Sequence, residues 1–355
     1  MNLRIGIVGL PNAGKSTLFN ALLKKQVADT APYPFCTIEP NVGVVPVPDA
    51  RLMKLAEITK EEEKMEKLPP LVPAIVEFVD IAGLVKGASK GEGLGNKFLS
   101  HIREVDVIAH VVRTFVDPSV INVAGEIDPA RDREIIETEL ILADMQTLEK
   151  QSEPRGVKER DAQEKWALIV RLKTELNRGK NAREGITDEK EIEMIRDLHL
   201  LSMKPVLFVE NVSENDVMEG SKANVVMICA KTEAELVALS ESEQKEYLLS
   251  LGLKESGLDR FIRQCYSYLG LISFLTCGEK EVRAWTIKND MKAPQAAGTI
   301  HTDFEKKFIK AEVVSFSDFV AVGGWKNARE NGKMRQEGRE YLMKDGDVVE
   351  FKVGS

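Results

Sequence analysis

The residues with the most evident chemistry lie near the N-terminus, at residues 9–16 (GLPNAGKS). This run matches the pattern G-x-x-x-x-G-K-[ST], between an apolar run at residues 3–8 and a stretch of helical spacing at residues 16–25. A strand, a glycine turn and a helix in that order place backbone N–H groups and a helix N-terminus around phosphate oxygens. We expect Lys15 to reach the β- and γ-phosphates and Ser16 to bind Mg²⁺. The alternative is a chance glycine turn before a helix, which the flanking strand and helix disfavour.

Two further segments are expected to complete the phosphate and metal site. Asp80 ends an apolar strand and Gly83 follows it, so we expect Asp80 to act through the water molecules around Mg²⁺ and the Gly83 N–H to contact the γ-phosphate. Thr37, in the loop PFCTIEP, is expected to close its hydroxyl onto the metal when the triphosphate is bound. Taken alone, a D-x-x-G pair is a weak signal and Thr37 is an ordinary loop threonine. The prediction rests on the spacing in the sequence between these residues and the glycine turn.

The choice of base depends on the segment Asn211-Val212-Ser213-Glu214, which follows an apolar strand. GTPases carry N-K-x-D there, and the Asp accepts hydrogen bonds from guanine N1–H and the 2-amino group. Adenine has neither donor, and the longer Glu214 cannot occupy the same position without backbone adjustment. Asn211 can serve the purine N7 or the adenine 6-amino group, because its amide both donates and accepts. We therefore predict a preference for ATP, with a site that accepts both purines as the alternative.

A second loop, Cys229-Ala230-Lys231, occupies the place where GTPases cover the base with S-A-K. Its backbone N–H groups are the useful part, and Cys229 is expected to pack rather than to react. The complete predicted nucleotide-binding set is Asn12, Ala13, Gly14, Lys15, Ser16, Thr17, Asn211, Val212, Cys229 and Ala230.

The sequence leaves the group that positions the attacking water unassigned. Leu84 stands where many GTPases place a Gln, and Leu cannot hydrogen-bond water, so slow intrinsic turnover is expected. His110 lies inside an apolar strand and is expected to be a core histidine. Asn122 can position water but cannot act as a base. A hypothesis remains for Asn12, whose amide oxygen would help to hold a monovalent cation such as K⁺ against the phosphates.

The remaining pattern predicts the elements that position these residues. Apolar runs at residues 3–8, 75–79, 107–112, 206–209 and 225–228 are typical of strands in a parallel sheet that is covered on both faces. Their alternation with helical stretches indicates an α/β core.

Two later parts of the chain differ from this core. Helical spacing, with apolar residues at 135, 136, 140, 142, 145 and 148 and again from 166 to 176, predicts an inserted αα-hairpin, with a short antiparallel coiled coil as one form. Its charges suit either a solvated face or a partner-binding face. The C-terminal part predicts a small α+β unit with strands at 282–287, 309–314 and 348–353 and a helix at 302–307 that Thr302 is expected to cap. Its cluster of Lys306, Lys307 and Lys310 suits either RNA or an ordinary soluble surface.

Length and composition limit the class of protein. The chain has 355 residues, of which 43% are hydrophobic and 30% charged, so two or three globular domains are expected. A formal charge of −8 excludes a uniformly basic nucleic-acid coat but not a local basic patch. The four cysteines have neither C-x-x-C spacing nor a nearby His, which argues against zinc or a disulfide scaffold. With no signal-peptide pattern and no apolar run of membrane-spanning length, we predict a soluble cytoplasmic protein without membrane contact.

The loops are also similar to those of a known family. The segments GLPNAGKST, PFCTIEPN and DIAGLVKGASKGEGLGN, together with the C-terminal unit, resemble the YchF/Obg-like ATPase family, in the translation-factor class of P-loop GTPases. The resemblance covers essentially the whole chain. It implies a P-loop G-domain-like parallel sheet with an inserted α-helical hairpin and a C-terminal β-grasp (TGS) domain. The predicted boundaries are 1–128 with 204–272 for the nucleotide domain, 129–203 for the insertion and 273–355 for the TGS domain.

The resemblance also implies a function and partners. It indicates an ATPase associated with the ribosome or its large subunit, with RNA contact through the TGS domain and the helical insertion. We therefore expect a Mg²⁺-dependent nucleotide switch that hydrolyses ATP to ADP and phosphate, in translation or a stress response. One alternative is a GTPase or dual ATP/GTP hydrolase of the same fold. Another is a ribosome or RNA adaptor in which nucleotide is mainly a sensor ligand, a reading that Leu84 favours.

Overall fold

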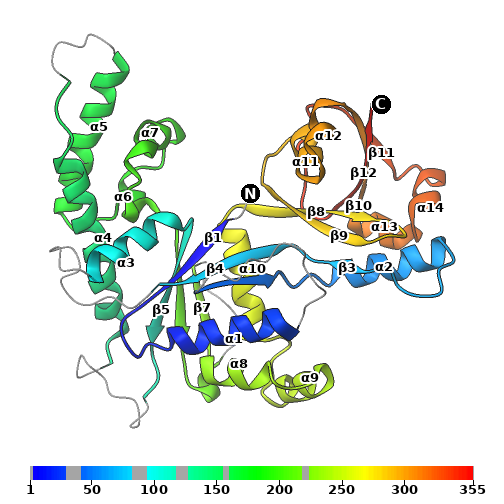
Figure 1. Cartoon of the computed structure of the whole chain (residues 1–355), viewed down its shortest axis with the longest axis horizontal. Helices are drawn as coiled ribbons and strands as arrows, with labels where there is room; N and C mark the ends of the chain where they lie inside the picture. Colours follow the sequence, from blue (N-terminus) through cyan, green and yellow to red (C-terminus); the bar gives the residue numbers. More distant parts are fainter. Residues whose placement is uncertain are drawn as a thin grey trace. The chain divides into compact units, whose positions relative to one another are not determined.

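A parallel β-sheet organises the first of two units in this computed structural model (Figure 1), which describes residues 3–28, 41–81, 94–116, 127–154, 160–217 and 224–354. Within these residues, six strands form this sheet in the order β2-β4-β1-β5-β6-β7. The strands are β1 (Arg4–Val8), β2 (Val42–Pro46), β4 (Ile75–Asp80), β5 (Val107–Arg113), β6 (Val206–Asn211) and β7 (Val225–Ile228). β1 pairs in parallel with β4 and β5, and β6 pairs in parallel with β5 and β7, which confirms the predicted parallel sheet.

Some helices of this unit pack on the sheet, whereas α5 and α7 of the insertion stand away from it (Figure 1). The described helices are α1 (Lys15–Ala28), α3 (Leu94–Glu104), α4 (Pro129–Glu149), α5 (Arg160–Asn177), α6 (Ala182–Gly185), α7 (Glu189–Ile195), α8 (Ala230–Leu236) and α9 (Glu241–Ser250). The first residues of α10 (Gly257–Tyr268), up to Phe261, also belong to this unit. The described residues also include the short 3₁₀ turns η2 (Arg196–Leu198), η3 (Leu201–Met203) and η4 (Glu214–Asp216).

Both faces of the sheet are buried, as its almost wholly apolar strands predict. Phe78 of β4 contacts Phe261 of α10, with 5.4 Å between the ring centroids. The next residue, Val79, packs instead with a cluster that includes Ile102 of α3 and Leu140 of α4. Neighbouring residues of a strand point to opposite faces, so α10 and the α3–α4 pair cover different sides of the sheet.

The register of the strands decides which loops meet. β5 pairs with β6 through Arg113↔Asn211, and β6 pairs with β7 through Asn211↔Ile228. Parallel strands end at the same edge of a sheet, so the segments after Val8, Asn211 and Ile228 all leave it together. This edge is therefore where the predicted site residues can meet.

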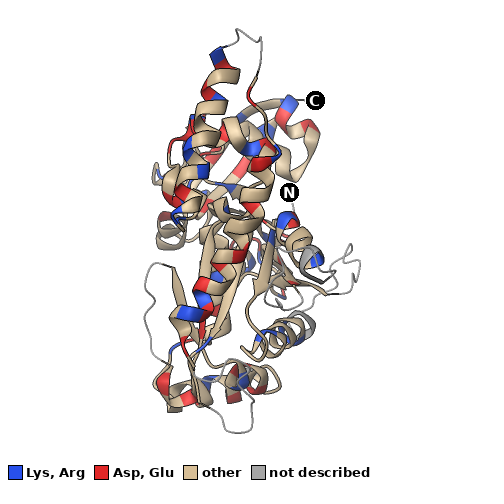
Figure 2. Ribbon diagram, turned by 90° about the vertical axis from the view of Figure 1, so that its left-hand side faces the viewer, with Lys and Arg blue, Asp and Glu red and all other residues tan. Residues whose placement is uncertain are grey.

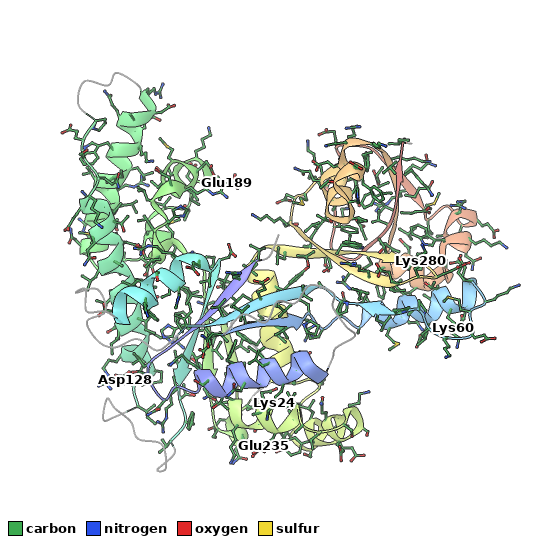
Figure 3. All side chains as sticks on the ribbon, in the orientation of Figure 1. Lys24, Lys60, Asp128, Glu189, Glu235 and Lys280 are labelled. Carbon is green, nitrogen blue, oxygen red and sulfur yellow. The ribbon has the colours of Figure 1, made fainter. Side chains whose placement is uncertain are left out.

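The helical insertion begins at a well-formed cap. Asp128, labelled in Figure 3, accepts hydrogen bonds from the backbone N–H groups of Ala130 and Arg131, both at 3.1 Å. On α4, Ile136 packs in the cluster of the sheet, whereas Leu148 packs with residues of α5. One helix thus buries residues on two faces. Residues on the remaining side of α4 belong to neither cluster.

The structure corrects one position in the predicted apolar stripe of α4. Leu142 is 42% exposed, because the two packed faces of the helix leave its side uncovered. Farther along α4, Asp144 is buried and accepts hydrogen bonds from the backbone N–H groups of Leu201 and Ser202, both at 2.7 Å. Burial raises the pKa of Asp144, and these hydrogen bonds oppose that shift. The carboxyl group thus attaches α4 to η3.

Charged side chains of the insertion pair with one another. Lys165 of α5 contacts Asp197 of η2 at 2.7 Å, and Arg171 of α5 contacts Glu191 of α7 at 2.5 Å. Basic and acidic positions are also interspersed along the described helices (Figure 2). These pairs favour the solvated-face interpretation for the residues involved, although exposed pairs of this kind add little stability.

The second unit is built around a mixed sheet. Its strands are β3 (Leu71–Val72), β8 (Leu271–Cys277), β9 (Val282–Lys288), β10 (Phe308–Ser315), β11 (Arg335–Glu337) and β12 (Asp347–Val353), and the described residues give the order β11-β10-β12-β8-β9-β3. β8 and β9 form an antiparallel pair, and β12 lies parallel to β8. This arrangement is the predicted β-grasp fold.

Helices cover both faces of this second sheet (Figure 1). They are α2 (Arg51–Glu62), α11 (Ala293–Ile300), α12 (Thr302–Lys306), α13 (Phe316–Val322) and α14 (Trp325–Glu330). Alanines of α11 pack with Phe274 and Ile287 in one core cluster, whereas α2 contacts β8 and β9. Helix α12 begins differently from the prediction, because the cap is His301, whose Nδ1 accepts from the Asp303 N–H at 3.2 Å, and Thr302 is the first helical residue.

The division of the chain by contacts differs from the predicted domain boundaries. One unit comprises Met1–Val45 and Glu77–Phe261, and the other comprises Pro46–Val76 and Ile262–Ser355. Residues 46–76 belong with the C-terminal residues because α2 and β3 pack on the second sheet and β3 pairs with β9. The helical insertion lies inside the first unit. Among the described helices, none combines the length and apolarity that a bilayer span requires.

Candidate nucleotide-binding site

The loop between β1 and α1 is held in a shape that two glycines make possible. A Cβ added to Gly9 would lie 2.4 Å from the Val111 carbonyl oxygen, and one added to Gly14 would lie 2.1 Å from Asn211 Nδ2. Gly14 has φ +97° and Asn12 has φ 63°, a region that Gly and Asn tolerate better than other residues. Helix α1 starts directly after this loop. The loop therefore has the close backbone approach and the helix N-terminus that phosphate binding uses.

Lys15 lies across this loop and is only 8% exposed. Its Nζ donates a hydrogen bond to the Leu10 carbonyl oxygen at 2.8 Å. Burial lowers the pKa of Lys15, and the negative charge of Asp80 opposes that shift. In turn, burial raises the pKa of Asp80 and Lys15 opposes the rise. The predicted phosphate-binding cation and metal-site acid are therefore electrostatic neighbours.

Asn211 connects the phosphate loop to the loop after β7. Its Nδ2 donates to the Ala13 carbonyl oxygen and its Oδ1 accepts from the Ala230 N–H, both at 3.0 Å. The side chain is 5% exposed. Sequence reasoning gave Asn211 a contact with the base and did not foresee this link. The second hydrogen on Nδ2 leaves one donor for a base in addition to the two backbone contacts.

A cavity of about 640 Å³ lies at this edge of the sheet. Every predicted nucleotide-binding residue except Ala13 lines it. Ala13 is buried beneath the loop, where its carbonyl oxygen meets Asn211. The structure adds lining residues that the predicted set did not include: Phe115, Val116, Ser213, Glu214, Lys231, Thr232 and Glu235. Figure 3 labels Glu235 on α8, below α1 in that view.

Phe115 is the residue among these that brings an aromatic ring to the cavity. It follows β5 by two positions, and Arg113 stacks its guanidinium group 4.6 Å from the centre of the Phe115 ring. Arg113 Nε also donates to the Phe115 carbonyl oxygen at 3.1 Å. One signal was available in the sequence, because an aromatic residue just beyond the end of a central parallel strand faces the ligand edge.

Several predicted residues lie outside the described part of the chain. These are Thr37, Gly83, Leu84 and Asn122. Their assignments to the metal, the γ-phosphate and the attacking water stay predictions.

His110 is a core residue, as the sequence suggested. It is 1% exposed on β5, and its ring lies 5.6 Å from the Phe208 ring. Burial lowers the pKa of His110 to about 3, and the positive charge of Arg133 adds to the shift. A neutral, enclosed imidazole of this kind is unsuited to activating water in the cavity.

Glu214 stands at the position of the guanine-binding Asp of GTPases and interacts with a neighbouring helix. Its Oε1 accepts a hydrogen bond from the hydroxyl of Tyr247 on α9. This hydrogen bond raises the pKa of Tyr247 to about 12, so the phenol remains a donor at neutral pH. Glu214 also lines the cavity.

The oxygen atoms at the site suit Mg²⁺. Ser16 is exposed and lines the cavity, so its hydroxyl is accessible, and Asp80 supplies a carboxylate close enough to interact with Lys15. Mg²⁺ prefers oxygen ligands and keeps several waters, and phosphates supply the rest in P-loop proteins. Within the residues that the structure describes, no group of three or more His, Cys, Asp and Glu side chains forms an all-protein metal site.

Comparison with known proteins agrees with this geometry. Residues 4–143 match a family model described as a 50S ribosome-binding GTPase, and residues 271–354 match one named YchF-GTPase_C and described as a protein of unknown function. A Bacillus subtilis protein named Ribosome-binding ATPase YchF is 49% identical, with 99% of each chain covered. This chain belongs to the YchF family.

Further members of the family support the assignment. An Escherichia coli O157:H7 protein, also named Ribosome-binding ATPase YchF, is 47% identical over 99% of each chain. The solved structure of the Schizosaccharomyces pombe YchF GTPase superimposes with a TM-score of 0.86 at 39% identity, and the match covers 99% of this chain and 98% of that one. The family's members are thus named both ATPase and GTPase, so the preferred base has to be argued from the site.

Proposed function

We propose that this chain is a Mg²⁺-dependent ATPase that converts ATP to ADP and phosphate and acts as a nucleotide-dependent switch on the ribosome. The observation that carries the proposal is the single cavity shared by Lys15 and Ser16 of the phosphate loop and Val212 of the loop after β6. Triphosphate and base would thus be bound by loops that Asn211 already connects. A GTPase or dual hydrolase of the same fold is the alternative that the binding experiment below tests.

The phosphate end of the cavity supports binding of a triphosphate. Lys15 would exchange its hydrogen bond to the Leu10 carbonyl for one to a β- or γ-phosphate oxygen, and the phosphate charge would restore its usual pKa. Ser16 would bind Mg²⁺, and Asp80 would hold it through water. The bound ion would neutralise charge on the β- and γ-phosphates. Gly83 and Thr37 keep their proposed parts as the γ-phosphate donor and the switch hydroxyl.

The base end supports adenine. Val212 is 8% exposed and Phe115 is half-buried, and both line the cavity, so they offer apolar surface to a purine ring. Asn211, Cys229 and Ala230 complete this end. The carboxylate that a guanine requires would come from Glu214, which is longer than Asp and is bound to Tyr247.

The proposal also includes a monovalent cation at the phosphate loop. Asn12 is exposed, lines the cavity and has a positive φ of 63°. Its amide oxygen would hold K⁺ against the phosphates and stabilise the charge that develops during hydrolysis.

The proposed macromolecular partner is the ribosome or its large subunit, which supports the cytoplasm as the compartment. The relatives' names support the ribosome, and the RNA contact through the TGS domain and helical insertion is a further proposal. Lys306 and Lys307 are exposed, whereas Lys310 pairs with Glu312 at 3.2 Å, so Lys306 and Lys307 are the better candidates for phosphate contacts. For the functional parts we propose the boundaries 1–128 with 204–272, 129–203 and 273–355, with residues 46–76 packed in the C-terminal unit.

Equilibrium binding of non-hydrolysable ATP and GTP analogues with Mg²⁺ tests the proposal. We expect the ATP analogue to bind more tightly, and a tenfold preference corresponds to about 1.4 kcal/mol. Tighter binding of the GTP analogue would overturn the base assignment and leave the phosphate assignment intact. Failure of both analogues to bind would overturn the proposed function. Co-sedimentation of Lys15→Ala with ribosomes would then separate a nucleotide-controlled switch from an adaptor that binds regardless of nucleotide.

A further inference from the structure

The hydroxyl of Tyr247 and the carboxylate of Glu214 form a contact whose consequence lies beyond nucleotide binding itself. We propose that Tyr247 is a specificity-determining positioning residue, which holds the Glu214 carboxylate so that it cannot accept both hydrogen-bond donors of a guanine. The inference rests on the proposed function, because it concerns the base end of the same cavity. Tyr247 itself is absent from the cavity lining, whereas Glu214 is part of it.

The Tyr247 ring is half-buried and packs against its neighbours. It packs in a small cluster with Leu236 of α8 and with Leu248 and Leu253. Helix α9, which carries Tyr247, begins with a capping box in which Ser240 and Glu243 bind each other's backbone N–H groups. The phenol oxygen is therefore presented to Glu214 from a packed element rather than from a free side chain.

The backbone around Glu214 is also held. The Val212 N–H donates to the Ile228 carbonyl oxygen at 2.9 Å, and Ser213 Oγ donates to Asp216 Oδ2 at 2.5 Å. Turn η4 is thus fixed on both sides of Glu214. Glu214 is itself exposed, and the structure shows its carboxylate in a hydrogen bond with Tyr247.

The chemistry of the two purines makes this contact selective. Guanine presents N1–H and a 2-amino group side by side, and a carboxylate satisfies both only when each of its oxygens faces one donor. The hydrogen bond from Tyr247 holds Glu214 Oε1 and so sets the direction in which the carboxylate faces. Each carboxylate oxygen can accept a second hydrogen bond, so it is this direction that would exclude guanine, whose two donors could be met only if the contact with Tyr247 were broken or distorted. Adenine presents an acceptor at N1 and no 2-amino group, so the same contact leaves its binding unaffected.

Tyr247→Phe tests the inference, because Phe keeps the ring in its cluster and removes only the hydroxyl. The measurement is equilibrium binding of the β,γ-imido analogues of ATP, GTP and inosine triphosphate with Mg²⁺. Inosine triphosphate carries N1–H but lacks the 2-amino group. In the variant we expect GTP-analogue affinity to rise about three- to tenfold, the inosine analogue to gain less, and ATP-analogue affinity to stay within about twofold.

The double variant Tyr247→Phe/Glu214→Ala is the matched control. If the released carboxylate causes the gain, removing it returns GTP-analogue affinity to the level of Glu214→Ala alone. An unchanged ATP-to-GTP ratio in Tyr247→Phe would overturn the inference, as would an equal loss for all three nucleotides, which would indicate a purely structural contact. A wild-type chain that binds none of the analogues would instead overturn the proposed function.

Discussion

Asn211 and Ala13 are 198 positions apart in the sequence, yet Asn211 Nδ2 donates to the Ala13 carbonyl oxygen at 3.0 Å. The same amide accepts from Ala230, so three loops at the edge of the sheet share one buried side chain. The contact is close enough that Gly14 could not carry a Cβ without meeting Nδ2. The base end and the phosphate end of the cavity are therefore mechanically linked before any nucleotide binds.

Asn211→Asp is expected to weaken both stability and nucleotide binding. The carboxylate can still accept from the Ala230 N–H, but it places an oxygen against the Ala13 carbonyl where a donor stood. Loss of a buried hydrogen bond with an acceptor left unpaired costs about 1–3 kcal/mol. Urea unfolding and ATP-analogue binding measure the two effects. Asn215→Asp makes the same chemical change at an exposed position of the same loop and should behave as wild type. Equal unfolding free energies for the two variants would contradict the link.

Lys15→Met is expected to abolish tight binding of the triphosphate. Met keeps most of the length of the side chain but removes the charge and the donor that we assign to the β- and γ-phosphates. A hydrogen bond between charged groups is worth about 1.5–3 kcal/mol, which predicts a loss of roughly 10- to 150-fold in ATP-analogue affinity. The exposed Lys24, on the same helix, provides the control Lys24→Met. The phosphate assignment fails if both variants bind like wild type in titration calorimetry.

Replacing Na⁺ by K⁺ is expected to raise ATP turnover by about an order of magnitude if Asn12 holds the cation. Asn12→Gly should remove that difference. Gly is chosen because it accepts the φ of 63° at this position without strain, so the variant loses only the amide. ATP-analogue affinity, measured in parallel, checks that the loop still binds nucleotide. Equal turnover of the wild-type protein in the two salts would exclude this use of K⁺.

Stability is expected to fall as pH rises, because of one buried acid. Glu233 of α8 is 4% exposed, and its Oε1 accepts from the Gly257 N–H at 2.7 Å, where α10 begins. Burial raises the pKa of Glu233 to about 7, whereas hydrogen bonds from Gly257 and Leu258 oppose the rise. An unfolded Glu titrates near pKa ~4.3, so the native state binds the proton more tightly. The stabilisation is therefore complete below pH ~4 and is lost as pH approaches 7.

Glu233→Gln mimics the protonated side chain and should remove this pH dependence. The difference in unfolding free energy between Glu233→Gln and wild type should shift by about 1–3 kcal/mol in favour of Gln between pH 5 and 8. Groups that titrate in both proteins cancel in that difference. Glu235→Gln, at an exposed position two residues away, should leave the wild-type profile unchanged. Parallel profiles for wild type and Glu233→Gln would show that Glu233 is already ionised at pH 5.

Local patterns were enough to predict much of this protein. The glycine turn of residues 9–16 and the apolar runs that became β1, β4, β5, β6 and β7 are short-range signals, since each depends on a few adjacent residues. A parallel sheet follows from these runs, and it places their carboxyl ends at one edge. The sequence therefore determined where a nucleotide site is predicted, and nine of the predicted residues line the cavity found there.

The tertiary structure decided what depends on distant residues. β3 has two residues and joins the sheet of the C-terminal unit by pairing with β9. No local sequence pattern predicts that pairing. The helix that carries Tyr247 begins 27 positions after Glu214, and packing against Leu236 brings the phenol to that carboxylate. Likewise, the sequence predicts that Asn211 binds the base, whereas the structure shows that its side chain connects two loops. Such contacts depend on the free energy of packing the whole unit, so they cannot be predicted from a pattern of neighbouring residues.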